Sequence, residues 1–289
     1  MEQSTCIPHF LLYRGCVAAA LEEDLEHGDI TTELTISRAE RGRSVIIAKE
    51  ETVVAGTFAA AEAFRLTDPG VHIDVVSGEG GLVQANDCIM KIEGRLAAML
   101  QAERVALNFL QRMCGVAALT RRFVEEISGQ GCRLVDTRKT TPGMRLLQKY
   151  AVRAGGGCNH RYGLSDGILI KDNHIAACGS VSEAVARARA GAPHLMKIQV
   201  EVTDVRELEE AVAAGADALL LDNMDVHTLA ENVNHARKLK PDIVLEASGG
   251  IRLENVLSVA RTGVDIISVG GLTHSAPAAD LSLKITGRS

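Results

Sequence analysis

The chain has 289 residues, with 31 Lys and Arg against 37 Asp and Glu, and so a formal net charge of −6. This length allows one large domain or two smaller ones, and the acidic balance argues against nucleic-acid or membrane-surface partners, which require a basic face. Seven scattered Cys without a Cys-x-x-Cys pair indicate reduced thiols, so we expect a cytoplasmic protein. The apolar stretch near the start is interrupted by His9, Arg14 and Glu22, and we expect a helix there rather than a signal peptide or membrane span.

The first part of the chain, to about residue 115, has mixed helix and strand patterns. Apolar runs at 44–48, 52–55 and 71–76 predict strands. A long helix is expected over 97–113; it carries Arg104 and leads through Gly115 into the second part. This half therefore predicts a separate α+β domain.

From Arg133 onward, apolar runs alternate with amphipathic helix patterns. The runs predict strands at 134–135, 168–170, 198–202, 218–221, 243–245 and 266–269. Gly191, Gly215 and Gly263 are expected to end helices. Six βα units occupy roughly 160 residues, where a full eight-unit barrel needs about 250, so a smaller barrel is favoured. An open doubly wound sheet is the alternative.

Polar residues follow every one of these predicted strands. One charged residue after a strand is usually just solvated, but six strands in a row predict a site, because both architectures bind ligands at the carboxyl ends of their strands. The residues concerned are Asp136, Arg138 and Lys139, then Lys171, Glu201, Asp222, Glu246, Ser248-Gly249-Gly250 and Gly270-Gly271, joined by Asn159-His160-Arg161.

Two glycine pairs close the last two βα units. Ser248-Gly249-Gly250 precedes a helix predicted over 252–260, where bare backbone N–H groups could approach a phosphate closely. Gly270-Gly271 could do the same, since the last two loops of a barrel often bind phosphate. A plain tight turn is the alternative for each pair.

Glu201 and Asp222 end adjacent predicted strands, so their carboxylates could share Mg²⁺ or, alternatively, bond neighbouring loops. Lys139 and Lys171 could act as Schiff-base nucleophiles, but the nearby cations Arg138 and Arg161 favour anion binding. The site therefore predicts a small polyanionic ligand.

The ordered motifs of the chain resemble the quinolinate phosphoribosyltransferase family. The resemblance covers almost the whole chain and rests on Glu23-Asp24, Gly28-Asp29-Ile30-Thr31, 103–108, 137–143, Asn159-His160-Arg161, Lys171-Asp172-Asn173-His174, Asp222-Asn223, 246–251 and Leu272-Thr273-His274. It implies an N-terminal α/β sandwich domain over 1–115, with the tail 276–289 packed on it, and an incomplete six- to seven-stranded α/β barrel over 116–275 that carries the active site. It also implies Mg²⁺-dependent transfer of phosphoribose from phosphoribosyl pyrophosphate to quinolinate with decarboxylation, in a homodimer or hexamer with shared active sites.

The resemblance also implies roles for individual residues. Those expected to surround quinolinate and the anionic parts of phosphoribosyl pyrophosphate are Arg138, Lys139, His160, Arg161 and Lys171, with Arg104 entering from the partner subunit. Glu201 and Asp222 are expected at the ribose hydroxyls and Mg²⁺. The 5′-phosphate is assigned to Ser248, Gly249, Gly270 and Gly271, and Thr137, Gly250 and His274 complete the substrate-binding set. Lys139, Lys171, Glu201 and Asp222 are the expected catalytic residues.

One departure from the family pattern concerns Gln199, where a carboxylate is common. Three other functions remain open at this point. They are a specialised relative found beside molybdate transporters, a nicotinate phosphoribosyltransferase, and a metabolite-binding regulator without turnover.

Overall fold

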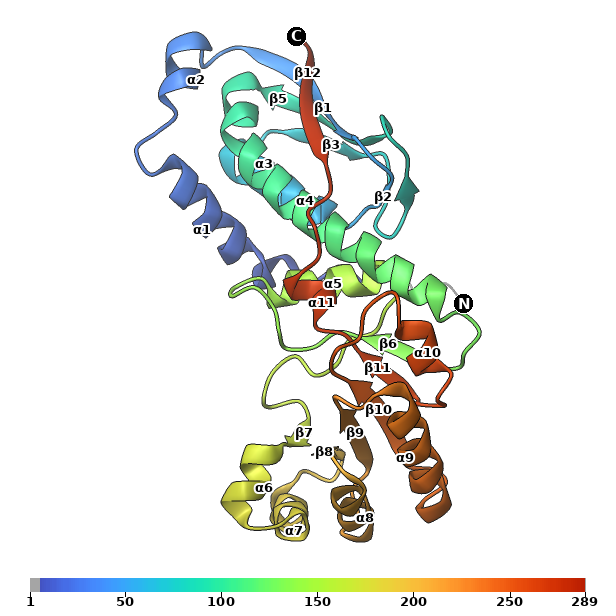
Figure 1. Cartoon of the computed structure of the whole chain (residues 1–289). Helices are drawn as coiled ribbons and strands as arrows, with labels where there is room; N and C mark the ends of the chain where they lie inside the picture. The colour runs from blue at the N-terminus through green and yellow to red at the C-terminus, as the bar shows by residue number, and fades with distance from the viewer. Residues whose placement is uncertain (1–5, 289) are drawn as a thin grey trace. The chain divides into compact units, whose positions relative to one another are not determined.

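The computed structural model describes residues 6–288, and within it the chain divides into two compact units (Figure 1). The first unit joins the residues up to Arg121 with Thr140–Gly156 and with Leu272 onward. The second unit joins Arg122–Lys139 with Gly157–Gly271. The chain therefore passes from one unit to the other several times.

The first unit is built on a four-stranded antiparallel sheet in the order β12-β1-β5-β3, beside a two-stranded pair, β2 and β4. Its elements are η1 (Phe10–Leu12), α1 (Arg14–Leu25), α2 (Ile30–Thr35), β1 (Arg41–Ala48), β2 (Thr52–Val53), α3 (Thr57–Thr67), β3 (His72–Val75), β4 (Leu82–Val83), β5 (Cys88–Arg95), α4 (Leu96–Glu126), α5 (Arg145–Ala154), α11 (Gly271–His274) and β12 (Leu281–Arg288). The last strand, β12, pairs antiparallel with β1, so the end of the chain joins this sheet.

Helices α3 and α4 cover one face of this sheet. Ser44 of β1 lies against Met99 of α4, and the Thr67 hydroxyl of α3 donates to the Ala98 carbonyl of α4. Four alanines of α3 are almost fully buried, which lets this helix approach its neighbours closely: Ala59, Ala60, Ala61 and Ala63. The result is a helix layer on an antiparallel sheet, the α/β sandwich that was expected.

Helix α4 is longer than the sequence pattern predicts, and it runs straight through Gly115. A Cβ at this position would lie 1.8 Å from the Pro277 carbonyl oxygen. Gly115 is therefore a point of close backbone approach rather than the end of the helix. The expectation that the helix stops near residue 113 was wrong.

The second unit is a six-stranded parallel sheet in the order β6-β11-β10-β9-β8-β7. Its elements are β6 (Arg133–Val135), β7 (Ile168–Ile170), α6 (Asp172–Cys178), α7 (Val181–Gly191), β8 (Ile198–Val202), α8 (Val205–Ala213), β9 (Ala218–Asp222), α9 (Val226–Leu239), β10 (Val244–Ser248), α10 (Val256–Ala260) and β11 (Ile266–Ser268). The order runs steadily from β7 to β11 and then to β6, without the reversal of a doubly wound sheet. The fold is thus an incomplete α/β barrel, as expected.

A short extended segment takes the place of a seventh strand beside β6. Val135 and Cys158 form a parallel bridge, the Cys158 N–H donates to the Leu134 carbonyl at 2.8 Å, and the Asp136 N–H donates to the Cys158 carbonyl at 3.3 Å. Because β6 and β7 do not pair directly, this segment and the residues that follow it lie at the gap of the barrel.

The outer helices α7, α8 and α9 pack side by side around the barrel (Figure 1). Gly215 directly follows Ala214, the C-cap of α8, with φ of +85°, as the sequence predicts, because glycine adopts this conformation without strain. Gly191 is instead the last residue of α7, with Ala192 as the cap, and Gly263 lies two residues beyond Arg261, the C-cap of α10. The expected glycine cap was therefore wrong at these two positions.

Candidate functional site

The strand register decides which side chains face the barrel interior. Leu169 pairs with Gln199, Glu201 pairs with Leu220, and Leu220 pairs in turn with Glu246. Paired residues of parallel strands point to the same face, and successive residues alternate. The interior therefore receives one row of side chains from each strand, and the row continues past the carboxyl end of each strand into the predicted site.

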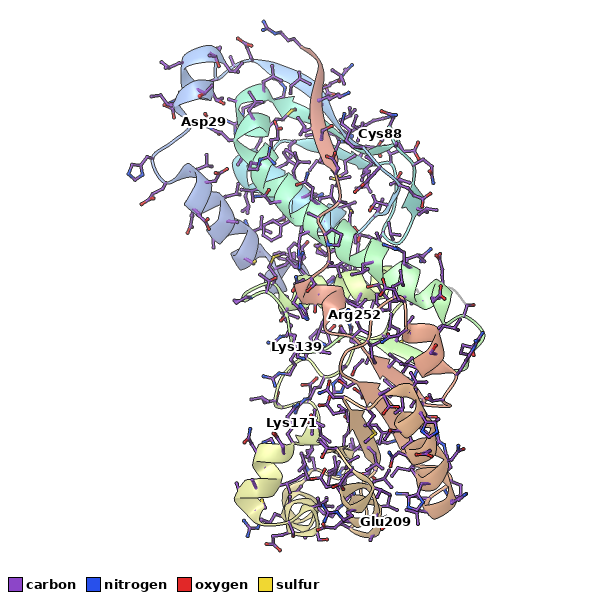
Figure 2. The ribbon with its side chains drawn as sticks, in the orientation of Figure 1. Asp29, Cys88, Lys139, Lys171, Glu209 and Arg252 are labelled. Carbon is purple, nitrogen blue, oxygen red and sulfur yellow. The ribbon has the colours of Figure 1, made fainter. Side chains whose placement is uncertain are left out.

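Two of the predicted catalytic residues form an ion pair at the carboxyl ends of β7 and β8. Lys171 Nζ lies 2.6 Å from Glu201 Oε2, with 45% of the lysine side chain and 12% of the glutamate side chain exposed. Lys171 and Lys139 follow the ends of β7 and β6, respectively (Figure 2). The Lys139 N–H donates to the Thr137 hydroxyl at 3.0 Å, and this bond shapes the loop after β6.

Asp222 ends β9, the strand next to β8. It lies two residues beyond Leu220, the partner of Glu201, and so on the same face of the sheet as Glu201. Its Oδ2 accepts a hydrogen bond from Asn223 Nδ2 at 2.7 Å. Among residues 6–288 there is no group of three or more His, Cys, Asp or Glu arranged to hold a metal ion. A cation at this place would therefore have two protein carboxylates and would need other oxygens from its ligand or from water.

The loop Ser248-Gly249-Gly250 has a backbone that only glycine adopts easily. Gly249 and Gly250 have φ of +92° and +62°. A Cβ on Gly249 would lie 2.1 Å from Asn223 Oδ1 and 2.9 Å from the Asn223 nitrogen, whereas one on Gly250 would meet nothing within 4 Å. Gly249 therefore keeps the loops after β9 and β10 in contact.

The helix after this loop begins later than the sequence predicts. Helix α10 starts at Val256, with Asn255 as its N-cap, rather than at residue 252. The expectation that Ser248-Gly249-Gly250 stands directly at a helix N-terminus was wrong. Gly271, by contrast, is the first residue of the short helix α11.

Residues at the gap of the barrel are anchored by the buried carboxylate of Asp136. Its Oδ1 accepts from the His160 N–H at 2.9 Å and its Oδ2 from Asn159 Nδ2 at 2.5 Å. Arg161 follows and donates from Nη1 to the Gly167 carbonyl at 2.7 Å. Burial and then the positive charge of Arg138 lower the pKa of Arg161, against the opposing effect of the Asp166 carboxylate.

Glu246 lies in the middle of the barrel and is only 1% exposed. Its Oε2 accepts from Gln199 Nε2 at 2.8 Å and lies 3.4 Å from His160 Nε2, while Oε1 is buried without a hydrogen-bond partner in the described part of the chain. Burial would raise the pKa of Glu246, but the contacts with His160 and Gln199 outweigh it and lower the pKa below its usual value. Glu246 is thus a buried anion. The sequence analysis placed Glu246 after a predicted strand and assigned it no role. A charged residue inside an apolar strand is nevertheless an unusual feature that could have indicated one.

A cavity of about 360 Å³ adjoins Glu246 inside the second unit. Its polar lining includes both signs of charge, from Arg133, Arg161, Lys197, Asp166 and Glu246, together with His160 and Gln199. The incomplete barrel therefore has a polar interior, unlike the layered apolar filling of a complete barrel.

Two predicted site residues, Arg104 and His274, belong to the first unit. Arg104 is exposed on α4, and Asn108 is exposed one turn later on the same face. His274 is exposed at the end of α11, with Nδ1 2.5 Å from the Ser275 hydroxyl. The other predicted site residues all lie in the second unit. No helix within residues 6–288 has both the length and the apolar character needed to cross a membrane.

The fold and the site define an α/β-barrel protein that gathers arginines, lysines, two carboxylates and glycine-rich loops at the carboxyl ends of its strands. Such a site suits a small polyanion.

Comparison with known proteins identifies the family within this class. The family models described as the N-terminal and C-terminal domains of quinolinate phosphoribosyl transferase match residues 29–114 and 116–284. The chain belongs to the quinolinate phosphoribosyltransferase family.

Individual relatives are similar along nearly their whole length. The probable nicotinate-nucleotide pyrophosphorylase [carboxylating] of Bacillus subtilis is 45% identical, covering 91% of this chain and 90% of its own. That of Synechocystis is 41% identical, covering 97% and 95%. The solved structure of the nicotinate-nucleotide pyrophosphorylase from Francisella tularensis is 38% identical, with a TM-score of 0.91 and coverage of 99% and 100%.

Proposed function

We propose that this chain transfers the phosphoribosyl group of phosphoribosyl pyrophosphate to quinolinate and releases pyrophosphate and carbon dioxide, giving nicotinate mononucleotide for NAD biosynthesis. Membership of the family supports this activity. The observation that carries it is that Arg138 and Arg161 follow two neighbouring extended segments, β6 and the segment bridged to it at Cys158, on the same barrel as the Lys171–Glu201 pair. Two arginines suit a dicarboxylate ligand. The scattered single cysteines support the cytoplasm as its compartment.

We assign quinolinate to Arg138 and Arg161, with the phosphoribosyl group on the neighbouring loops. Lys139 and Lys171 are cations that can neutralise phosphate charge. The 5′-phosphate is assigned to the backbone N–H groups of the two glycine-rich loops, because glycine lets an anion approach the main chain. The remaining members of the proposed substrate set are Thr137, Ser248, Gly249, Gly250, Gly270, Gly271 and His274. In this proposal, residues 116–275 are the barrel domain that carries the site, and residues 1–115 are the N-terminal domain.

The chemistry requires stabilisation of positive charge on the ribose and of negative charge on the leaving group. Departure of pyrophosphate leaves an oxocarbenium-like carbon, which the carboxylates of Glu201 and Asp222 can stabilise. The pyridine nitrogen then forms the new bond and becomes a pyridinium. The positive nitrogen stabilises the electron pair that stays on the neighbouring ring carbon when the adjacent carboxylate leaves as carbon dioxide, and a proton from water then binds that carbon in place of the carboxylate. Positioning therefore suffices and a covalent nucleophile is not needed.

Phosphoribosyltransferases generally use a divalent metal, and we propose Mg²⁺ for this one. Glu201 and Asp222 supply two carboxylates, and Mg²⁺ commonly takes one or two carboxylates together with substrate phosphate oxygens and water. When bound, Mg²⁺ neutralises charge on the pyrophosphate.

We also propose a homodimer, or a larger assembly such as a hexamer built from such dimers, in which Arg104 enters the site of the partner subunit. Its exposed position on α4 supports this role, because the side chain is available to a neighbour.

A turnover assay with quinolinate, nicotinate and a control without pyridine tests the function. Product is expected only with quinolinate, and only when Mg²⁺ is present. Equal turnover with nicotinate, or no turnover by folded protein with quinolinate, would refute the assignment.

A further inference from the structure

One buried side chain connects two segments of the first unit that are far apart in the sequence. Gln148, on α5, is fully buried. Its Oε1 accepts the Thr141 N–H at 2.9 Å, and its Nε2 donates to the Thr141 hydroxyl at 3.0 Å and to the Thr273 carbonyl at 3.1 Å. Both the oxygen and the nitrogen of the amide are therefore used, and we call this arrangement the Gln148 clasp.

The partners of the amide fix its orientation. If the amide were turned over, its oxygen would face the Thr273 carbonyl and its nitrogen would face the Thr141 N–H, and both contacts would be repulsive. The Thr273 carbonyl also accepts from Arg112 Nη2 on α4, and Arg112 Nη1 donates to the Ala276 carbonyl at 2.5 Å. Thr273 is thus bonded from both α4 and α5, two helices of the first unit.

The clasp lies just beyond two places where the chain passes from the second unit to the first. These passages follow Lys139 and Gly271, so Thr141 and Thr273 are each the second residue after one of them. Four members of the proposed site lie at the two passages: Lys139, Gly270, Gly271 and His274. Thr141 itself is exposed, so without Gln148 its N–H would bond to water.

We propose that Gln148 is a positioning residue for phosphoribosyl pyrophosphate. It fixes the backbone two residues after Lys139 and one residue before His274, so it orders both segments before the ligand binds. A site that is ordered in advance loses less entropy on binding and therefore binds more tightly. The effect on phosphoribosyl pyrophosphate rests on the proposed function. The hydrogen bonding of Thr141 does not.

The first measurement is amide hydrogen exchange at Thr141, followed in ¹H–¹⁵N spectra of the whole protein in heavy water. The amide of an exposed loop residue exchanges freely unless a hydrogen bond protects it. In wild type we expect the Thr141 amide to exchange at least about tenfold more slowly than an unprotected amide. Gln148→Met keeps the length of the side chain without its amide and should abolish this protection. Free exchange of the Thr141 amide in wild type would overturn the proposal.

The second measurement is the kinetics of Gln148→Met and Thr141→Val. In Gln148→Met we expect KM for phosphoribosyl pyrophosphate to rise roughly tenfold, the size of one lost buried hydrogen bond, with kcat changed much less. Thr141→Val removes only the hydroxyl and should raise the same KM about threefold. Because both changes act through the clasp, the double variant should be no worse than Gln148→Met. Effects that multiply in the double variant, or an unchanged KM in Gln148→Met, would overturn the proposal.

A matched control lies on α4, where Gln111 Nε2 donates to the Leu281 carbonyl at 3.0 Å. Gln111→Met removes the same kind of bond to the C-terminal segment and should leave KM unchanged. An equal rise in KM in this control would overturn the proposal, because Gln148 would then act only through the stability of the unit.

If Gln148→Met does not fold, the exchange of Thr141 in wild type and the KM of Thr141→Val decide the proposal. If the wild-type protein fails to convert quinolinate, the proposed function fails, and the exchange of Thr141 alone decides whether the clasp exists.

Discussion

Gly249 shows how one residue can fix two loops of the site. Its φ of +92° is already unfavourable for other residues, and the space for a Cβ is occupied by Asn223, which itself has a φ of +55°. Asn223 also donates its backbone N–H to the Ser248 carbonyl at 2.9 Å. The loops after β9 and β10 are therefore packed against each other and hydrogen-bonded.

This contact predicts different effects of alanine at neighbouring positions. Gly249→Ala must displace the Asn223 backbone and should lose about 3 kcal/mol of stability, whereas Gly250→Ala meets open space and should lose only about 1 kcal/mol for its left-handed backbone. Gly249→Ala should also raise KM for phosphoribosyl pyrophosphate more strongly. Denaturant titration and steady-state kinetics measure both effects. Equal stability of the two variants would show that the loops can separate without cost.

The arginine pair predicts a selective loss of affinity. Arg138→Ala and Arg161→Ala each remove a charge-assisted contact worth about 1.5–3 kcal/mol with a carboxylate. Quinolinate binding should weaken by this amount, while phosphoribosyl pyrophosphate should still bind. Calorimetric titration of both ligands provides the measurement. Unchanged quinolinate affinity in both variants would show that these arginines do not bind quinolinate.

At the scale of elements, apolar runs predicted the positions of the barrel strands well, because a strand buried on both faces must be apolar along its length. The same criterion missed β5, in which Lys91, Glu93 and Arg95 interrupt the buried residues Ile89, Met90 and Ile92. It also missed β12, which is largely exposed at the edge of the sheet. Half-exposed strands depend on partners distant in sequence, and a local pattern does not reveal these.

Asp217 joins a helix to a barrel strand and allows a test by pH. Its Oδ2 accepts from the Ile198 N–H of β8 and from Arg189 of α7, both at 2.8 Å. Burial raises the pKa of Asp217, but the Ile198 hydrogen bond and the Arg189 contacts outweigh it, so the net pKa is lowered. A lowered pKa stabilises the fold above the pKa of the unfolded chain, about 4, and this contribution is lost as pH falls through the folded value.

Asp217→Asn should therefore destabilise the protein at pH 7 by about 1 kcal/mol, a value reduced by partial exposure of the ion pair. The difference from wild type should shrink as the pH is lowered below about 4. Thermal unfolding across this pH range measures it, with the exposed Asp242→Asn as control. A difference that stays constant with pH would mean that the charge of Asp217 contributes nothing.

For the whole molecule, the sequence predicted where the site lies but not what holds it together. Strand ends placed Lys171, Glu201 and Asp222 correctly at one end of a barrel, since that follows from the order of strand and helix alone. The link from His160 to Glu246 spans the barrel interior, and it depends on a register between strands that no local pattern specifies. The sequence likewise assigned Arg104 to the site of a second subunit only through resemblance.

The proposed sharing of each site between two subunits predicts the activity of mixed dimers. If Arg104 acts in the partner's site, a dimer of one Arg104→Ala subunit and one Lys139→Ala subunit has one site with both defects and one site with neither. Random mixing makes about half of the dimers mixed, and one of their two sites is intact, so activity should return to about a quarter of wild type. Each variant alone should be inactive. Subunit exchange must be verified with differently tagged chains, and a verified mixture that stays inactive would mean that Arg104 does not act across the subunit interface.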